Sequence, residues 1–380
     1  MKYIKSAAAV LAAGAMITGA SHANETATLY GSIEIGLGYD TARLKKQSAS
    51  RLGLHSGVGR FGLMGSHSLD AETSVRYVLE SGFVPASGAG SPTRLFSREA
   101  TLGVVNTRLG AIDVGRHYNF SALYTGAVDP FGGGYGLSGL DSTVGSGLRL
   151  DNLVLYQSPN FAGFEGGVGY SFNVDDVTWS NENKRLAQGD PADSTRHFFG
   201  ASKHTRLFTT GLQYAKGPFN AMVAYDKVWR RNDAPGKSLG TTIEAWVLGA
   251  AYEVEPVTLY GTVHHTVDGW MSAKNMAYMP GKDTGFKDYH YAKGFAATTG
   301  MLGVRMDRGP HRYMASWQHA RARNKRLTGH DRPFNMYSLG YRYSLSKRTE
   351  LTAFVSYGSN YAFVGALDGV QSSMRIRHRF

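Results

Sequence analysis

Cysteine is absent from this chain of 380 residues. Without disulfides, the fold must be closed by hydrogen bonding or by a core. Long apolar runs are missing too, because after residue 23 no stretch approaches the ~20 apolar residues that a membrane-spanning helix needs. No linker, charge block or low-complexity tract divides the chain. These absences exclude a disulfide-stapled scaffold and a helical membrane protein, and they favour one continuous domain.

The first 23 residues have the character of a secretory signal peptide. Lys2 and Lys5 make a basic start, residues 6–20 form an uncharged run rich in alanine, and residues 21–23 offer small side chains around a cleavage point. A membrane anchor is the alternative, but the run is too short and too rich in alanine. We expect residues 1–23 to be removed and residues 24–380 to form the mature domain. Without the two lysines, 39 of the 41 basic residues remain against 29 acidic residues, a net charge of +10.

The composition of the chain is unusual for a soluble enzyme of this size. Glycine occurs 48 times, tyrosine (22) exceeds phenylalanine (18), and the mean hydropathy is slightly negative. A membrane β-barrel needs apolar residues only at alternate strand positions, and aromatic girdles at both interfaces. The composition therefore favours a membrane barrel.

Alternation of apolar and polar residues is the main structural signal. Within residues 28–39, Leu29, Ile33 and Leu37 fall on one face, and Glu34 falls on the other. A period of two over this length indicates a strand and not a helix. The pattern predicts sixteen strands, at residues 28–39, 60–67, 73–83, 95–106, 110–116, 150–158, 163–174, 205–216, 218–229, 241–254, 257–266, 297–307, 311–321, 334–345, 348–359 and 371–380.

The connections between these strands alternate in length. Short turns such as residues 107–110 and 346–347 take turns with long links, at residues 40–59, 84–94, 117–148, 175–204, 230–240, 267–296, 322–333 and 360–370. Short turns on one rim and long loops on the other are typical of outer-membrane barrels, and a bilayer requires every strand edge to be paired. We therefore predict an all-β fold, a sixteen-stranded antiparallel transmembrane β-barrel.

The last predicted strand indicates what the barrel encloses. Arg375, Arg377 and Arg379 alternate with apolar or aromatic residues and end beside Phe380. Each arginine would cost roughly 2–4 kcal/mol near the midplane of the bilayer, so all three must face a wet interior. This alternation predicts a lumen wall and a pore, not a packed core.

Several segments along the chain resemble one known family. They are residues 28–31 (TLYG), 60–65 (RFGLMG), 114–116 (VGR), 129–132 (DPFG), 156–164 (YQSPNFAGF) and the C-terminal 374–380 (MRIRHRF). Together, and in this order, they resemble the trimeric porins of Gram-negative bacteria, of the β-proteobacterial kind. The resemblance covers the whole mature chain.

The resemblance implies both an architecture and a set of partners. It implies a homotrimer of sixteen-stranded barrels, with the third long loop (residues 117–148) folded into the lumen to narrow the pore. It implies that Phe380 is the signal read by the outer-membrane assembly machinery. Basic pairs in long loops, at residues 45–46, 230–231 and 325–326, are candidates for contact with outer-membrane lipids and lipopolysaccharide.

Arginines supply the candidate constriction. The family pattern places Arg60, Arg98 and Arg149 opposite the inward loop. The alternation itself places Arg76 in the lumen on the same face as Glu80, which we assign to the lumen wall, and Arg116 ends a strand where the loop begins. Each of these arginines has an alternative interpretation, in which it only solvates the lumen wall or pairs with a nearby acid.

The inward loop itself carries little charge. Residues 117–148 contain eight glycines, no lysine or arginine, and only two acids, Asp129 and Asp141, which we expect to face the arginines. An insert of this length without regular structure is usually functional. Five arginines against two aspartates at a narrow neck favour anions over cations.

Other patterns in the chain do not indicate chemistry. Residues 57–62 (GVGRFG) fit the letters of a dinucleotide fingerprint but have no helix after them. His264 and His265 are adjacent on a strand and point to opposite faces, which is poor geometry for one metal. No Ser-His-Asp set and no basic run with interleaved aromatics is evident. We expect no catalytic residues, no cofactor, no metal and no nucleic-acid partner.

The sequence leaves more than one function open. The leading hypothesis is a porin that passes small ions and hydrophilic solutes by passive diffusion. A substrate-selective channel of the same fold is the second, and saturable block of conductance by one solute would distinguish it. An outer-membrane barrel enzyme or an adhesin is the third, and absence of solute flux would favour it.

Overall fold

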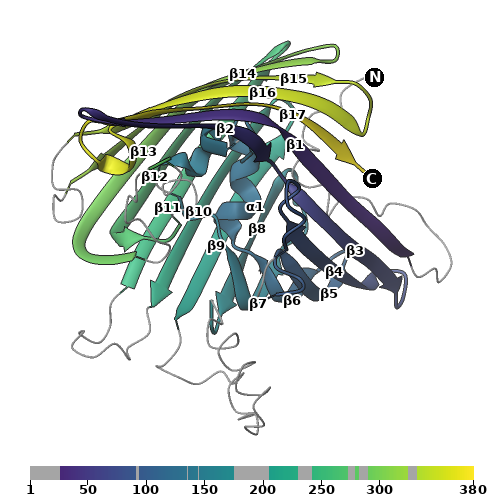
Figure 1. Cartoon of the computed structure of the whole chain (residues 1–380). Helices are drawn as coiled ribbons and strands as arrows, with labels where there is room; N and C mark the ends of the chain where they lie inside the picture. Colours follow the sequence, from purple (N-terminus) through teal and green to yellow (C-terminus); the bar gives the residue numbers. More distant parts are fainter. Residues whose placement is uncertain are drawn as a thin grey trace, which may run out of the picture.

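The computed structural model of the chain describes residues 26–90, 94–134, 136–143, 145–174, 205–229, 242–272, 279–281, 290–323 and 332–380. These residues form one antiparallel sheet that closes on itself, because β1 (Thr26–Leu44) pairs with β17 (Leu367–Arg379). Figure 1 shows the resulting barrel, with the first and last strands side by side. Within these ranges, no helix is long and apolar enough to cross a membrane.

The strands follow one another around the barrel in chain order, and from β3 onward each strand pairs with the next. Between β1 and β17 they are β2 (Gln47–Ser56), β3 (Gly59–Ser68), β4 (Thr73–Phe83), β5 (Glu99–Asn106), β6 (Gly110–Tyr118), β7 (Arg149–Gln157), β8 (Phe164–Ser171), β9 (Arg206–Lys216), β10 (Phe219–Trp229), β11 (Thr242–Val254), β12 (Val257–Trp270), β13 (His290–Arg308), β14 (His311–Ala322), β15 (Phe334–Ser344) and β16 (Thr349–Ser359).

Two of these strands share one position in the barrel. β1 pairs with β2 through residues 35–44 and with β3 through residues 26–32. β2 and β3 therefore lie end to end along the same edge of β1. The break between them falls at Gly57 and Val58, where the backbone N–H of Gly57 donates to the carbonyl of Glu34 at 2.8 Å. The described part of the barrel thus has sixteen strand positions, which confirms the predicted fold.

The prediction of a long loop at residues 40–59 is wrong. β1 continues to Leu44, the chain turns at Lys45 and Lys46, and β2 returns antiparallel. Lys45 has a φ of 55°, the left-handed conformation that a tight turn requires. Most side chains of residues 40–51 are polar, so the apolar–polar alternation is interrupted there. Backbone pairing nevertheless continues to the turn, because the ladder is made by main-chain groups.

Other boundaries of the long links also differ from the prediction. β12 extends to Trp270 and β13 begins at His290, so the ends of the predicted link 267–296 are strand. η5 (Tyr361–Phe363) lies within the predicted link 360–370, and β17 already begins at Leu367. The predicted signal peptide and the links at residues 175–204 and 230–240 lie outside the described residues.

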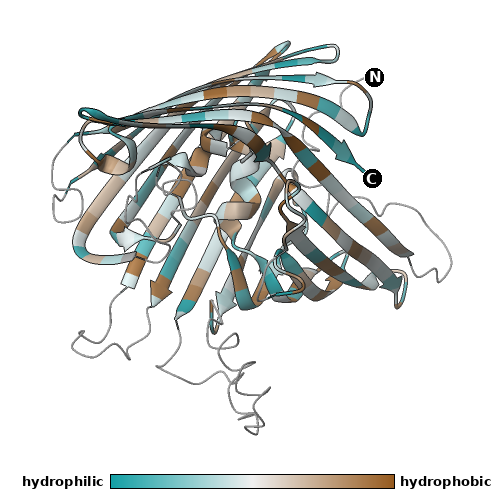
Figure 2. Ribbon diagram, in the orientation of Figure 1, coloured by the Kyte–Doolittle hydropathy of each residue, from teal (hydrophilic) through white to brown (hydrophobic). Residues whose placement is uncertain are grey.

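The two faces of the barrel differ in polarity, and Figure 2 shows the alternation along the strands. Leu37, Leu302 and Met374 are 59%, 62% and 66% exposed and lie on the outer face. Their neighbours along the strands point inward and are largely polar or small, which is the pattern of a barrel with an apolar outside and a polar inside.

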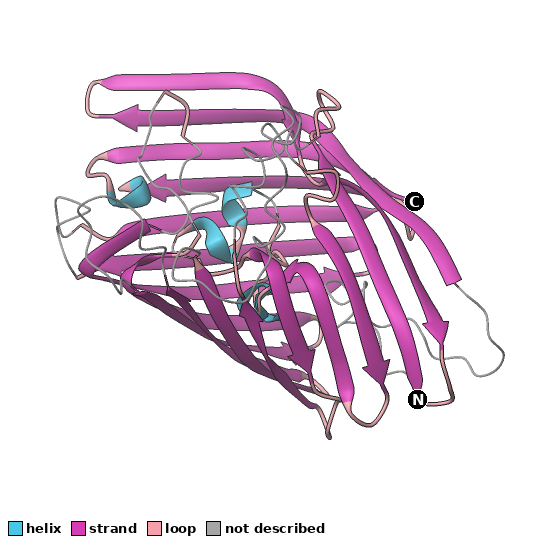
Figure 3. Cartoon of the chain, turned by 90° about the horizontal axis from the view of Figure 1, so that it is seen from below, coloured by secondary structure: helices cyan, strands magenta, loops and turns pink. Residues whose placement is uncertain are grey.

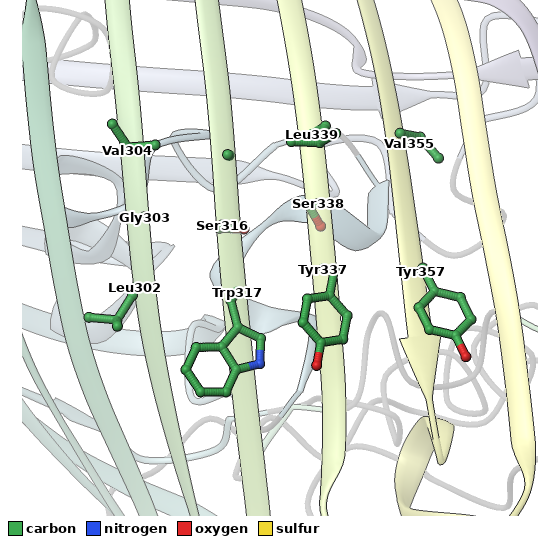
Figure 4. Close-up of a pocket in the computed structure, with 11 residues that line it drawn as sticks. Leu302, Gly303, Val304, Ser316, Trp317, Tyr337, Ser338, Leu339, Val355 and Tyr357 are labelled. Carbon is green, nitrogen blue, oxygen red and sulfur yellow. The ribbon is translucent and has the colours of Figure 1, made fainter.

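A shallow groove of about 630 Å³ crosses the outer face over β13–β16. It opens where Ala315 is small, and its walls are apolar or aromatic, including Leu302, Leu339 and Val355. Figure 4 shows Trp317, Tyr337 and Tyr357 at one level on three neighbouring strands, near the ends that lead to the long links. The groove is outside the barrel and is therefore not part of the pore. Its aromatic rim matches the girdle expected at a membrane interface.

The link between β6 and β7, here called the inward segment, lies inside the ring of strands in Figures 1 and 3, and its described residues are 119–134, 136–143 and 145–148. The segment contains α1 (Phe120–Thr125), η1 (Gly126–Val128), η2 (Gly136–Ser138) and η3 (Leu140–Ser142). α1 packs against β9–β11, η1 against β10–β12, and η2 against β15 and β16. The segment therefore crosses the inner wall from the end of β6 toward β16 and returns to β7.

Candidate pore lining and constriction

Asn119 holds the two ends of the inward segment together. Its backbone N–H donates to the carbonyl of Leu148 at 3.1 Å, and its side-chain oxygen accepts from the N–H of Leu148 at 2.8 Å. Its side-chain amide donates to the carbonyl of Ser146 at 2.7 Å. The same oxygen caps α1 by accepting from the N–H of Ala122 at 3.2 Å. One side chain thereby closes the base of the segment and starts its helix.

Asp226 on β10 fixes this base to the barrel wall. The carboxylate is fully buried, accepts from the side-chain amide of Asn119 at 2.9 Å, and also accepts from the hydroxyl of Ser121. The N–H of Phe120 donates to the hydroxyl of Thr209 on β9 at 3.0 Å. A buried carboxylate is costly unless it is hydrogen-bonded, so these contacts determine where the segment begins on the wall.

Asp129 is placed differently from the prediction that it faces the arginines. It is only 2% exposed, and its carboxylate turns into the inward segment, where it accepts from the N–H groups of Phe131, Gly133 and Leu140 at 2.9–3.0 Å. A carboxylate at a glycine-rich turn finds backbone donors within two to four residues. Asp129 therefore holds the shape of the segment.

Asp141 lies in η3, and its side chain is outside the described part of the structure. Its role in the constriction stays a prediction.

Glu80 on β4 joins two of the predicted arginines. Its carboxylate lies 3.4 Å from Nη1 of Arg60 on β3, and it accepts a hydrogen bond from Nε of Arg98, which directly precedes β5. The hydroxyl of Tyr30 on β1 also donates to Glu80 at 3.1 Å. Glu80 is 3% exposed, so it is the centre of a buried charge cluster on the inner face of β1 and β3–β5.

Arg76 forms a separate pair with Asp113 on β6. Its guanidinium binds both carboxylate oxygens, with Nε 2.8 Å from Oδ1. This bidentate geometry is the strong form of an arginine–carboxylate contact. Arg76 lies four residues from Glu80 along β4, or roughly 13 Å at the rise of a strand, on the side of the short turns. Arg76 is thus set apart from the other predicted arginines.

Arg116 shares a carboxylate with an arginine that the sequence did not single out. Nη1 of Arg116 and Nη1 of Arg94 lie 2.5 Å and 2.7 Å from the same oxygen of Asp151 on β7. Nε of Arg116 donates to the carbonyl of Ser97 at 2.9 Å. Asp151 thereby ties the link between β4 and β5 to the point where the inward segment leaves and rejoins the barrel.

Arg149 and Arg98 converge on one neutral group. The hydroxyl of Tyr118 accepts from Nη2 of Arg149 at 2.7 Å and from Nη2 of Arg98 at 3.1 Å. The guanidinium of Arg149 also lies over the ring of Tyr118, 4.6 Å from its centroid. Among the described residues, no ion pair joins Arg149 to a carboxylate. Two guanidinium groups therefore meet beside the start of the inward segment, and within the described residues only Arg98 of the two forms an ion pair, with Glu80.

The three arginines of β17 alternate with exposed apolar residues, as their spacing predicted, but they pair with acids on the neighbouring strands. Arg377 binds Glu34 on β1 and lies 3.0 Å from Glu350 on β16. Arg375 lies 3.5 Å from Glu34, and Arg379 lies 2.9 Å from Glu350. These pairs fasten the seam where the barrel closes.

Phe380 is at that same seam. Its backbone N–H and carbonyl exchange hydrogen bonds of 3.1 Å with Gly31 on β1. A Cβ atom at Gly31 would collide with the ring of Phe380, so the glycine leaves room for the terminal aromatic side chain.

Sequence reasoning missed Tyr118, Arg94, Asp113 and Asp151. It also missed Glu99, whose carboxylate lies 3.6 Å from Nε2 of His117. The alternation contained a signal for Asp113, because its neighbours Ile112 and Val114 are both about half exposed on the outer face. No such signal marked Tyr118 or Arg94, whose contacts come from other strands.

The remaining sequence patterns do not form a reaction centre. Within the described ranges, no group of three or more His, Asp or Glu residues is arranged to hold a metal ion. His264 is buried on the inner face, whereas His265 lies on the opposite face with Nδ1 2.8 Å from the hydroxyl of Thr298. Gly57 and Val58 lead directly into strand β3 and not into a helix, so they do not form a dinucleotide-binding turn.

Comparison with known proteins agrees with this architecture. The family described as Gram-negative porin matches residues 7–362. The chain is 35% identical over 403 residues to an outer membrane porin of Bordetella pertussis, covering all of both chains, and 25% identical to outer membrane porin protein 32 of Delftia acidovorans, covering 95% of this chain and 90% of that protein. The solved structure of an anion-selective porin from Comamonas acidovorans is similar in fold, with a TM-score of 0.67 at 19% identity over 94% of this chain and all of that one.

A closed barrel with an apolar outside, a polar inside and a segment packed against its inner wall is thus found together with a family match over nearly the whole chain. Porins are channels and not enzymes. The chain belongs to the Gram-negative porin family and is an outer-membrane porin.

Proposed function

We propose that this porin passes small hydrophilic solutes and ions by passive diffusion and prefers anions. The observation that carries the preference is the meeting of Arg98 and Arg149 at the hydroxyl of Tyr118, beside the base of the inward segment. Arg98 also pairs with Glu80, which Arg60 shares, whereas Arg149 has no ion pair within the described residues, so these three arginines and one glutamate keep a positive potential at that point of the lumen. A positive potential attracts anions and repels cations.

The charge balance of the surrounding wall supports the same sign. Six arginines and four carboxylates lie on or beside β3–β7, on the inner face: Arg60, Arg76, Arg94, Arg98, Arg116 and Arg149 against Glu80, Glu99, Asp113 and Asp151. Asp129 of the inward segment keeps its negative charge although backbone N–H groups bind it, so these described side chains total six arginines against five carboxylates. The excess of positive charge is smaller than a count of arginines alone suggested, but its sign is unchanged.

Reversal potentials test this proposal. The purified porin would be inserted into a planar bilayer separating two KCl concentrations, and the zero-current voltage would be measured. We expect stepwise conductance with a reversal potential that favours chloride. Stepwise conductance with a preference for potassium would keep the pore and reject the preference, whereas absence of conductance would reject passive diffusion.

The assembly and partners of the protein are part of the proposal. We infer that it is exported with a cleaved signal peptide at residues 1–23, that it forms a homotrimer, and that the assembly machinery reads Phe380. Contact of basic loop residues with lipopolysaccharide is proposed on charge alone, and the turn at Lys45 and Lys46 is the one such pair within the described residues. Cross-linking of the native protein would show trimers, and mass spectrometry of its mature N-terminus would locate the cleavage.

A further inference from the structure

We propose that a row of glycines on the inner wall sets the distance between the wall and the inward segment, and thereby the size of the pore. The row consists of Gly211 on β9, Gly249 on β11, Gly303 on β13 and Gly340 on β15. Each is followed or preceded by a leucine that is exposed on the outer face, at positions 212, 248, 302 and 339, so the glycines face the lumen. The proposal deepens the diffusion function above and does not depend on the ion preference.

The first two glycines seat the helical part of the inward segment. A Cβ atom added at Gly211 would lie 2.8 Å from Cβ of Phe120 and 2.9 Å from the ring of Tyr124. One added at Gly249 would lie 2.6 Å from Cγ2 of Val128. Real Cβ atoms essentially never come within 3.0 Å of another heavy atom, so these side chains occupy the space that a larger wall residue would need.

The next two glycines seat the turn that follows. A Cβ atom at Gly303 would lie 2.7 Å from Cγ of Pro130, and one at Gly340 would lie 2.6 Å from Cε1 of Phe131. Consecutive parts of the segment thus rest on glycines of every second strand around this side of the barrel.

Larger side chains on the intervening strands make three of the four glycines depressions, whereas Gly211 pairs with the small residues Ala224 and Gly167. Met222 on β10 pairs with Gly249, Tyr260 on β12 pairs with Gly303, and Met314 on β14 pairs with Gly340. None of the four glycines has the positive φ that would require glycine for backbone reasons. Glycine inside a strand is destabilising by roughly 0.5–1 kcal/mol relative to alanine. Space for the inward segment is therefore the physical reason for glycine at these positions.

The segment has one direction in which to move when a seat is filled. Ordinary contact begins at 3.4 Å, so a methyl group at Gly249 or Gly340 requires a displacement of about 0.8 Å at that contact. The barrel wall is hydrogen-bonded on both sides, and Asn119 and Asp226 hold the base of the segment. The remaining freedom is toward the lumen, where the displaced segment narrows the pore.

The test uses substitutions that fill single seats. Gly249→Val and Gly340→Leu would be compared with Gly300→Val and Gly261→Leu, which lie on strands of the same barrel and have no heavy atom within 4 Å of an added Cβ. Unit conductance would be measured in 1 M KCl, where the Debye length of about 3 Å suppresses charge effects. Vesicle swelling with neutral sugars of increasing size would give the size cut-off. We expect both seat variants to lose conductance and to exclude sugars that the controls admit.

An exchange of volumes separates this effect from a folding defect. In the double variant Gly249→Val with Val128→Gly, the side chain moves from the segment to the wall, and we expect conductance and size cut-off to return toward the unsubstituted values. The exchange also serves if Gly249→Val alone does not assemble. Three results would overturn the proposal. The assembled seat variants could have wild-type conductance, the control variants could lose conductance to the same extent, or the exchange could fail to restore conductance and size cut-off. If the seat variants change the size cut-off as expected but the porin prefers cations, only the ion preference is rejected.

Discussion

Arg149→Gln is the substitution that most directly tests the proposed anion preference. Its guanidinium binds the hydroxyl of Tyr118 and lies over the ring, and within the described residues it has no ion pair with a carboxylate. Glutamine retains a donor for the hydroxyl but removes the charge. The potential at the start of the inward segment should therefore fall without a change in the fold.

The expected size of the effect follows from Coulomb's law. At roughly 8 Å from a permeating ion in water, one unit charge contributes about 0.5 kcal/mol. Removal of the charge destabilises an anion and stabilises a cation by that amount, so the difference between them changes by about 1 kcal/mol. This corresponds to roughly a fivefold fall in the ratio of anion to cation permeability.

The assay is the reversal potential in a KCl gradient, near 0.1 M and near 1 M. The effect should be largest at the lower concentration, where the Debye length is about 10 Å, and small at the higher one. Arg149→Lys, which keeps the charge, should stay near the unsubstituted value. Arg108→Gln is a control of equal charge change, because Arg108 is 77% exposed on a short turn and pairs with Glu72. If Arg149→Gln shifts the reversal potential no more than Arg108→Gln does, the reasoning is refuted.

Three further predictions concern stability and assembly. Asp226→Ala leaves two buried donors of the inward segment unsatisfied, at a cost of about 1–3 kcal/mol; we expect a lower thermal unfolding temperature and a noisier open-channel current, and wild-type noise would contradict the anchoring role. Phe380→Ala keeps the backbone pairing with β1 but removes the terminal ring; we expect less assembled porin in outer-membrane fractions, and an unchanged amount would show that the ring is dispensable. The N–H groups of Glu72 and Thr73 hold the pKa of Asp70 below its usual value. The contribution of Asp70 to stability is therefore present above the usual carboxyl pKa and is lost as the pH falls through the lowered pKa. Asp70→Asn should lack this pH dependence in acid unfolding measurements.

The sequence was sufficient for the strands because alternation is local. Leu37 and Glu34 differ in environment since successive side chains of a strand point to opposite faces, and this can be recognised within a few residues. The same signal failed around the tip of the first hairpin, at residues 40–51, where most side chains are polar and the backbone pairing shows the strands.

The candidate site could be predicted only in part. The arginines of the lumen face were recognisable from alternation or from family resemblance, but their partners were not. Arg94 meets Asp151 across 57 positions, and Arg377 meets Glu34 across 343. Asp129 was expected to face the arginines because it is one of two acids on the inward segment, and the structure shows it bound to backbone N–H groups of that segment.

By itself, the sequence determined that the chain is a barrel, which residues face lipid and which face the interior, and that arginines occur on the interior face, because each of these depends on the alternation along the strands and on the composition. Only the tertiary structure decided which charges neutralise one another, that Arg149 and Arg98 share Tyr118, and that the inward segment rests on Gly211, Gly249, Gly303 and Gly340. These contacts join strands that are far apart in sequence, and they exist because closing the sheet gives every inward residue a fixed set of neighbours.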